Sequence, residues 1–201
     1  MPFRGGAGSG RQTIATPLTE FDWKAAATQS FYFLGIKHGL PLTQGKTRRE
    51  LGGRFFPDWY SSIQGIQGWD DGDSALTSCI AHPMQGGVAG FICIQNDPSG
   101  KALEFEWSSP YWQSRLRALG WSALYSIQFE LDPISEATIG NVGKKRGTGG
   151  FVDLVVTPTA GLGMIVFEDW LDTHWVRRLE ARTDSKKKKV FCRILFNPQR
   201  A

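Results

Sequence analysis

Cysteine is scarce in this chain, which has three cysteines among its 201 residues. Cys79, Cys93 and Cys192 form no CxxC pair, and an odd number cannot close completely into disulfides. Cys79 and Cys93 also lie in an apolar run, where cysteine usually behaves as a small hydrophobic side chain. We therefore expect neither a fold held by disulfides nor a cysteine-based zinc site.

Motifs of several enzyme classes are also missing. The chain has no GxSxG sequence, which carries the nucleophile of many hydrolases, and no HExxH sequence, which binds zinc. His38, His82 and His174 are scattered, and none has a carboxylate at the needed offset on its own helix. The glycine-rich residues 147–150 lack the lysine and the spacing of a phosphate-binding loop. The sequence therefore predicts no metal and no bound cofactor.

The glycine-rich start of the chain lacks the apolar core of a secretory signal peptide. We expect a flexible lead over residues 1–18, a helical domain over 19–182 and a basic tail with a short strand over 183–201. The length suits one such domain, and no internal repeat divides it.

Positive charge is concentrated at the other end. The net charge is +4, but residues 174–201 hold nine basic and two acidic side chains, which leaves +7 there and a slightly acidic remainder. A basic end beside an apolar body suits anionic lipid or nucleic acid, while a solvated surface segment is the simpler alternative. Because no aromatic side chains are interleaved with the basic run, we expect no nucleic-acid partner.

Apolar periodicity and helix-ending residues predict a mainly α protein. Helices are expected over 20–38, 57–66, 74–95, 110–131 and 151–181, with short extended segments over 103–107 and 190–196. The expected architecture is a compact bundle of kinked helices that are rich in small residues, with one or two short strands.

Small residues form ridges on three of these helices, where they let two backbones approach closely. They are Cys79, Gly86, Gly90 and Cys93, then Ser114, Ala118, Ser122 and Ser126, then Thr157, Ala160, Gly161 and Gly163. Such packing is common in membranes, and the 22 uncharged residues from 74 to 95 are enough to span a bilayer. The uncharged runs 118–129 and 154–167 are shorter, so a soluble bundle stays open as the alternative.

Ionisable residues interrupt these apolar stretches and need partners there, because a buried charge without one is costly. Pro83 removes a backbone hydrogen bond, so His82 is expected at a bend, where it can satisfy a freed backbone group. For Glu130 the expected partner is Arg115 or Arg117 from a neighbouring turn or helix.

Four of these residues form the candidate site: His82, Glu130, Asp153 and Glu136. One hypothesis is a buried polar cluster of His82, Glu130 and Asp153 that ties three helices together. The other is a catalytic group, with His82 as base and a carboxylate that orients it. Glu168 and Asp172, one turn apart, are expected instead at an exposed helix end.

The order of several short motifs resembles a bacterial family that is known as a domain of unknown function. They are Asp70, Ile80-Ala81-His82-Pro83-Met84-Gln85-Gly86, Arg115, Gly120-Trp121-Ser122, Phe129-Glu130, Pro133-Ile134-Ser135-Glu136, Asp153, Thr157 and Gly161-Leu162-Gly163. The family occurs in envelope proteins, sometimes ahead of an outer-membrane barrel, and the resemblance covers about half of the chain. It departs at Thr77 and Ser78, where the family often has asparagine, and at Val88 and Ala89, where it has aromatic pairs.

The resemblance implies a helical, membrane-associated domain in the periplasm or at the outer membrane, and it implies no activity. We therefore expect a structural or interaction protein of the bacterial envelope, with membrane lipid or an envelope protein as its partner. The alternative is a membrane-embedded enzyme that acts on lipid or glycan, with His82 as its base.

Overall fold

The computed structural model describes residues 20–43, 45, 48, 54–66, 68–69, 76–135 and 151–200. Among them the regular elements are helices and no strand forms, which confirms the mainly α prediction. The candidate residue Glu136 lies outside these ranges, as do the glycine-rich residues 147–150.

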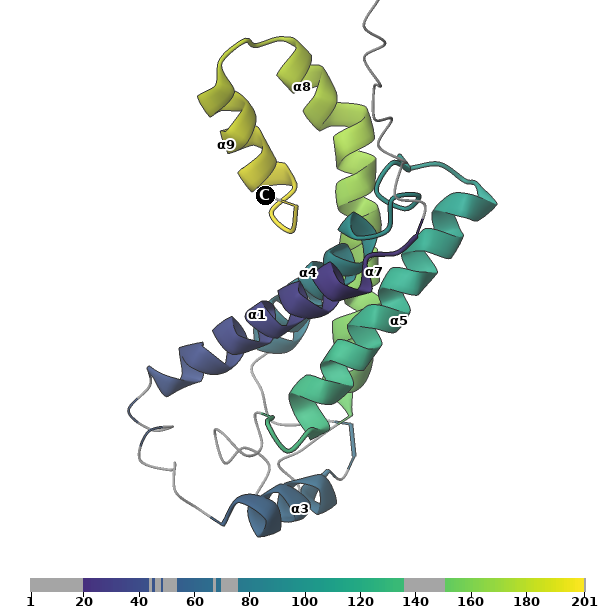
Figure 1. The fold of residues 1–201 in the computed structure, drawn as a ribbon. Helices are drawn as coiled ribbons and strands as arrows, with labels where there is room; N and C mark the ends of the chain where they lie inside the picture. The colour runs from purple at the N-terminus through teal and green to yellow at the C-terminus, as the bar shows by residue number, and fades with distance from the viewer. Residues whose placement is uncertain are drawn as a thin grey trace, which may run out of the picture.

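Figure 1 shows the arrangement of the helices. They are α1 (Trp23–Leu42), α3 (Phe55–Gly65), α4 (His82–Gln95), α5 (Ser109–Leu131), α7 (Val152–Leu171), α8 (Arg177–Ala181) and α9 (Lys186–Phe196). A π-helical turn, Thr77–Ala81, leads into α4, and a second one, Asp172–Val176, joins α7 to α8. The predicted helix over 151–181 is therefore one helical length that contains a wider turn.

The core consists of α4, α5 and α7, which pack along one another. Gly86 of α4 faces the backbone of Thr157 in α7, with no room for a side chain between them. A Cβ at Gly161 would lie 2.7 Å from the amide nitrogen of Gly87, and one at Gly90 would lie 2.6 Å from Ile165 Cδ1. Gly86, Gly90 and Gly161 of the predicted ridges thus bring α4 and α7 into close contact, as the sequence predicts, whereas Cys79 and Gly163 lie outside this contact.

The first helix lies across this core (Figure 1). Its aromatic rings pack on rings of α5. Phe33 stacks on Tyr125 with ring centroids 5.2 Å apart, and His38 stacks on Phe129 at 5.0 Å. The Asp22 side chain caps the helix by accepting a hydrogen bond from the Ala25 amide at 2.9 Å. The helix continues to Leu42, past its expected end, because a proline in the last turn removes only one late hydrogen bond.

The predicted strand over 190–196 is wrong, since these residues belong to helix α9. Val190, Phe191, Ile194 and Leu195 share one helical face, and Lys186–Lys189 occupy the first turn. So short an apolar run fits a strand and a helix equally well, and the lysines before it extend the segment to helical length. Figure 1 shows α8 and α9 folded against each other as a hairpin beyond one end of the core.

Candidate functional site

His82 is the first residue of α4 and follows directly on the π-helical turn Thr77–Ala81. A proline inside a helix clashes with the carbonyl one turn earlier, and the wider π turn before Pro83 relieves that crowding. The helix is therefore irregular next to His82, where a bend was predicted, and the irregularity is a π-helical turn. Such turns are common at functional sites because they re-aim one side chain without ending the helix.

Three of the four candidate residues come together from three helices. His82 of α4, Glu130 near the end of α5 and Asp153 in the first turn of α7 place their ligand-type atoms within 4.8 Å of one another. His82 and Asp153 are buried, and Glu130 is half-buried. This group, called here the His–Glu–Asp cluster, has the membership that the sequence hypothesis gave it, and its role stays a prediction.

The imidazole of His82 is held on both sides. Its Nε2 lies 3.4 Å from Asp153 Oδ2, and its Nδ1 lies 3.4 Å from the hydroxyl of Thr157, one turn further along α7. A neutral imidazole carries one N–H. If Nδ1 carries it and donates to Thr157, Nε2 directs a lone pair toward the two carboxylates, which is the state that binds a cation.

Asp153 is positioned by its place in the helix and by its backbone. The carboxylate lies in the first turn of α7, where the helix dipole favours negative charge. The Ser126 hydroxyl donates a hydrogen bond to the Asp153 carbonyl oxygen at 3.2 Å, so α5 is tied to the start of α7 one turn before Glu130.

A second polar group at the other end of the core was not foreseen. The Asp169 carboxylate accepts hydrogen bonds from the Tyr111 hydroxyl at 2.9 Å and from Arg115 Nε at 2.8 Å, and it pairs with Arg200. Arg115 is 0% exposed and also donates to the Gly100 carbonyl oxygen at 3.1 Å. Each buried charge thus has a partner, as burial requires.

The expected pairing of Glu130 with Arg115 or Arg117 is wrong, since Arg115 pairs with Asp169 and Arg117 pairs with Asp97. Arg115 and Glu130 lie about four turns apart on one helix, which excludes a direct contact along it. Asp169 carries no sequence signal that marks it as the partner, because the pairing depends on how α7 packs beside α5.

Glu168 and Asp172 are also buried, at 3% and 5% exposure, which corrects the prediction of an exposed helix end. Residues 197–200 fold back over α7 and cover them. Asn197 Nδ2 donates to Asp172 Oδ1 at 3.0 Å, and the Gln199 amide donates to Glu168 Oε1 at 3.3 Å. Burial raises the pKa of Glu168 to about 7, against the opposing effects of the Gln199 amide and Arg200.

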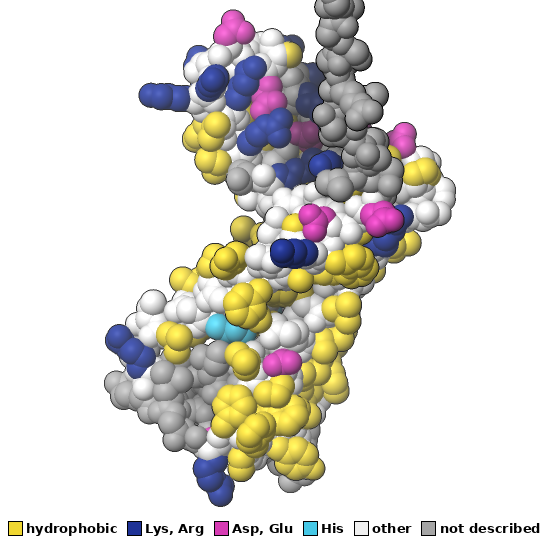
Figure 2. All heavy atoms as spheres, in the orientation of Figure 1, with side chains coloured by type: hydrophobic (Ala, Val, Ile, Leu, Met, Phe, Trp, Pro, Cys, Tyr) yellow, Lys and Arg dark blue, Asp and Glu magenta, His cyan; other side chains and the backbone are white. Residues whose placement is uncertain are grey.

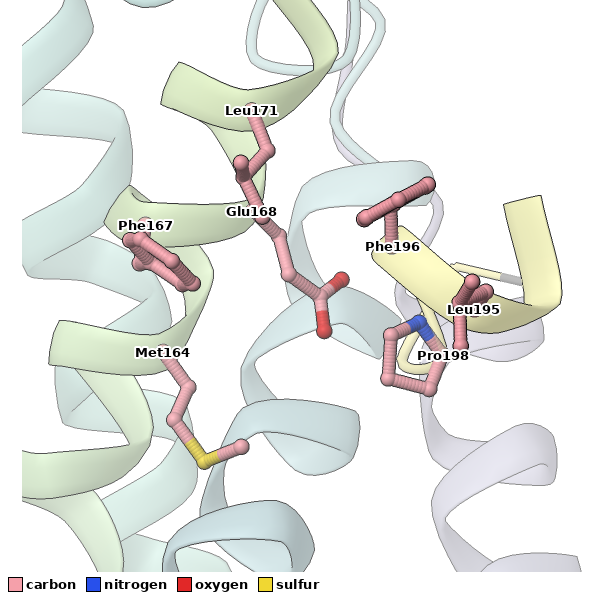
Figure 3. Close-up of a pocket in the computed structure, with 7 residues that line it drawn as sticks. All are labelled: Met164, Phe167, Glu168, Leu171, Leu195, Phe196 and Pro198. Atoms are coloured by element: carbon pink, nitrogen blue, oxygen red, sulfur yellow. The ribbon is translucent and has the colours of Figure 1, made fainter. Parts of the chain in front are cut away.

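Between α7 and α9 lies a cavity of about 330 Å³. It is lined by Met164, Phe167, Glu168, Leu171, Leu195, Phe196 and Pro198. Figure 3 shows the Glu168 side chain reaching from α7 toward α9 among these apolar side chains. The walls suit an apolar group, with one carboxyl as the polar contact.

The surface separates into an apolar body and a basic end. Figure 2 shows apolar side chains over the lower body and lysine and arginine gathered on the hairpin of α8 and α9. Large exposed apolar side chains include Trp23, Phe31, Tyr32, Ile36 and Leu40 on α1, Leu116, Leu124 and Ile127 on α5, and Phe191, Ile194 and Leu195 on α9. Apolar surface this extensive is typical of sites of contact with a membrane or a protein.

One helical length, Val152–Ala181, is long and apolar enough to cross a membrane. In its most apolar stretch of 18 residues, 33% of the residues are buried inside the protein. A core helix of a soluble protein can have the same length and composition. Length and composition therefore do not assign this helix to a bilayer.

Comparison with known proteins brings no match to a family model, to a curated protein or to a solved structure. The resemblance to the envelope family thus stays a prediction, and the function has to be argued from the geometry.

Proposed function

We propose that this is a membrane-associated helical protein that lays its apolar faces into lipid and its basic end on the headgroups. The observation that carries the proposal is the separation of the surface in Figure 2 into an apolar body and a basic hairpin. The resemblance to envelope proteins favours the bacterial envelope as the location, where the protein would have a structural or interaction role.

Helix α9 has the composition of a helix that lies in a membrane surface. Lys186, Lys187 and Lys188 are exposed, and the exposed apolar side chains of Phe191, Ile194 and Leu195 follow them. Basic side chains attract anionic headgroups, and an apolar face buried beside them adds area that salt does not screen.

The body of the protein contributes the larger apolar area. Along α1, Phe31, Ile36 and Leu40 are each more than half exposed, and along α5 so are Leu116 and Leu124. In a soluble protein such rows are usually interrupted by polar residues or covered by a partner chain. In a membrane, lipid tails cover them.

Membrane fractionation tests the proposal. The full chain is expected to sediment with cell membranes, to resist washes with high salt and with carbonate, and to enter solution only with detergent. Recovery in the soluble fraction before any wash would overturn the proposal, and the apolar rows would then be protein interfaces.

The second candidate is an enzyme that acts on a lipid or glycan, with His82 as the general base. The approach of Asp153 to His82 favours it, because a carboxylate beside an imidazole orients the ring and stabilises its protonated form. His82→Ala and Glu130→Gln would then fold normally and fail to complement a deletion. A parallel loss of fold and complementation supports a structural cluster instead.

A further inference from the structure

We infer that the His–Glu–Asp cluster is a binding site for one divalent transition-metal ion, for which Zn²⁺ is the probe. The inference is independent of membrane association. It departs from the sequence prediction of no metal, which considered ligand spacing along single helices. Here the three ligands come from α4, α5 and α7, and only packing brings them together.

The ligand types suit such an ion. Imidazole nitrogen and carboxylate oxygen together bind zinc, iron and manganese, whereas calcium and magnesium prefer oxygen alone. One histidine with two carboxylates also neutralises the charge of a divalent ion, which lowers the cost of keeping these groups in a largely buried place.

The separation of the best-placed pair fits two ligands of one ion. Ligands bound at about 2.1 Å, at angles of about 90° to 110°, lie about 3.0 to 3.4 Å apart. His82 Nε2 and Asp153 Oδ2 are 3.4 Å apart. That is long for a direct N–H···O hydrogen bond, which is usually about 2.7 to 3.2 Å. Glu130 places its ligand atom within 4.8 Å of the other two, and its side chain has three rotatable bonds by which it can approach a bound ion.

The residues around the ligands are arranged as in metal sites, where a neighbouring group contacts the second ring nitrogen of the histidine and orients it. Thr157 lies beside Nδ1 of His82, so the ring nitrogen that faces away from the carboxylates has its own partner. Close contact of Gly86 with Thr157 fixes α4 against α7 one turn away. The site therefore rests on rigid backbone, which preserves ligand geometry.

Three protein ligands leave at least one coordination position for water or a substrate oxygen, and the half-buried Glu130 provides the side from which it can enter. An ion bound at Nε2 also takes the lone pair that His82 needs as a general base. The metal site and the His82-base enzyme are therefore mutually exclusive uses of the cluster.

The test is a Zn²⁺ titration of the purified full chain in detergent after it has been stripped with a chelator. Calorimetry is expected to give one ion per chain, and the melting temperature is expected to rise with Zn²⁺, because the ion joins three helices. Cobalt(II) in place of zinc is expected to give ligand-field bands without the charge-transfer band of a thiolate, which excludes binding at the cysteines.

Asp153→Asn and Glu130→Gln keep the shape of each side chain and weaken its ligand oxygens. Each is expected to raise the Kd for Zn²⁺ at least about tenfold. His174→Ala is the matched control, because His174 lies beyond the opposite end of α7 and its variant should bind as the wild type does.

Two results would overturn the inference. One is a wild-type Kd for Zn²⁺ weaker than about 100 µM. The other is unchanged affinity in both carboxylate variants. The wild-type titration and the cobalt spectrum decide the matter even if a variant fails to fold.

Discussion

The carbonyl oxygen of Thr157 in α7 occupies the place that a side chain on Gly86 of α4 would need. His82 and Asp153 each lie one helical turn before these two residues. The backbone contact between the two helices therefore sets the distance between the imidazole and the carboxylate. Gly86, which has no side chain, thus controls the geometry of the candidate site.

Gly86→Ala should destabilise the protein, because its methyl group would overlap backbone that cannot move without separating α4 from α7. Overpacking of this kind costs about 1 to 3 kcal/mol. Gly163→Ala is the control, since nothing lies within 4 Å of its added methyl and the helix gains from alanine. Thermal melts of both variants check this, and equal melting temperatures would contradict the tight contact.

Asp169→Ala should be strongly destabilising, because it leaves Arg115 buried without its carboxylate. Removal of one partner of a buried pair costs about 3 to 5 kcal/mol. The control is Arg117→Ala, which removes an arginine whose side chain is 59% exposed from its pair with Asp97. The Asp97 carboxylate is buried but keeps hydrogen bonds from the Ser99 amide and hydroxyl, so loss of the solvent-exposed arginine should cost less than about 1 kcal/mol. Chemical unfolding of both variants measures the difference, and similar losses would refute the buried network.

Glu168 should make stability depend on pH. Its pKa is raised from 4.5 to about 7 in the folded protein, so between these values the folded state holds a proton that the unfolded state has lost. The stabilisation that comes from this bound proton is fully present below pH 4.5 and is lost as the pH rises through 7.

Glu168→Gln keeps the shape and removes the titration, so the variant should gain stability relative to the wild type as pH rises from about 5 to about 8. Unfolding measured at several pH values gives this difference. If the difference in unfolding free energy between the variant and the wild type does not vary with pH, Glu168 is ionised throughout this range.

Replacement of Lys186, Lys187 and Lys188 by alanine should weaken binding to vesicles that contain anionic lipid. Each lysine near such a surface contributes about 1 kcal/mol, so the three together should lower the partition coefficient about a hundredfold. The control replaces three exposed basic residues elsewhere, Lys24, Arg54 and Lys101. Vesicle sedimentation compares the two variants, and equal binding would mean that α9 does not face the headgroups.

The sequence alone was sufficient for the helical class and for the presence of close contacts between the core helices. The helix that begins at Ser109 follows a capping serine and has proline in its first turn, which are local signals. The ridges of small residues predicted close helix contacts, since a missing side chain permits backbone approach whatever the partner. His82, Glu130 and Asp153 were identifiable because each interrupts an apolar stretch.

The partners of the buried charges were decided by tertiary structure. Asp169 receives Arg115 because α7 lies beside α5, and Glu168 is buried because residues 197–200 return over it. No local sequence pattern predicts this pairing or this burial, because both bring together segments that are far apart in the chain. The same holds for the spacing of the His–Glu–Asp cluster, which depends on the register of three helices. Periodicity shows which face of a helix is apolar, and only packing shows which residues of another helix that face meets.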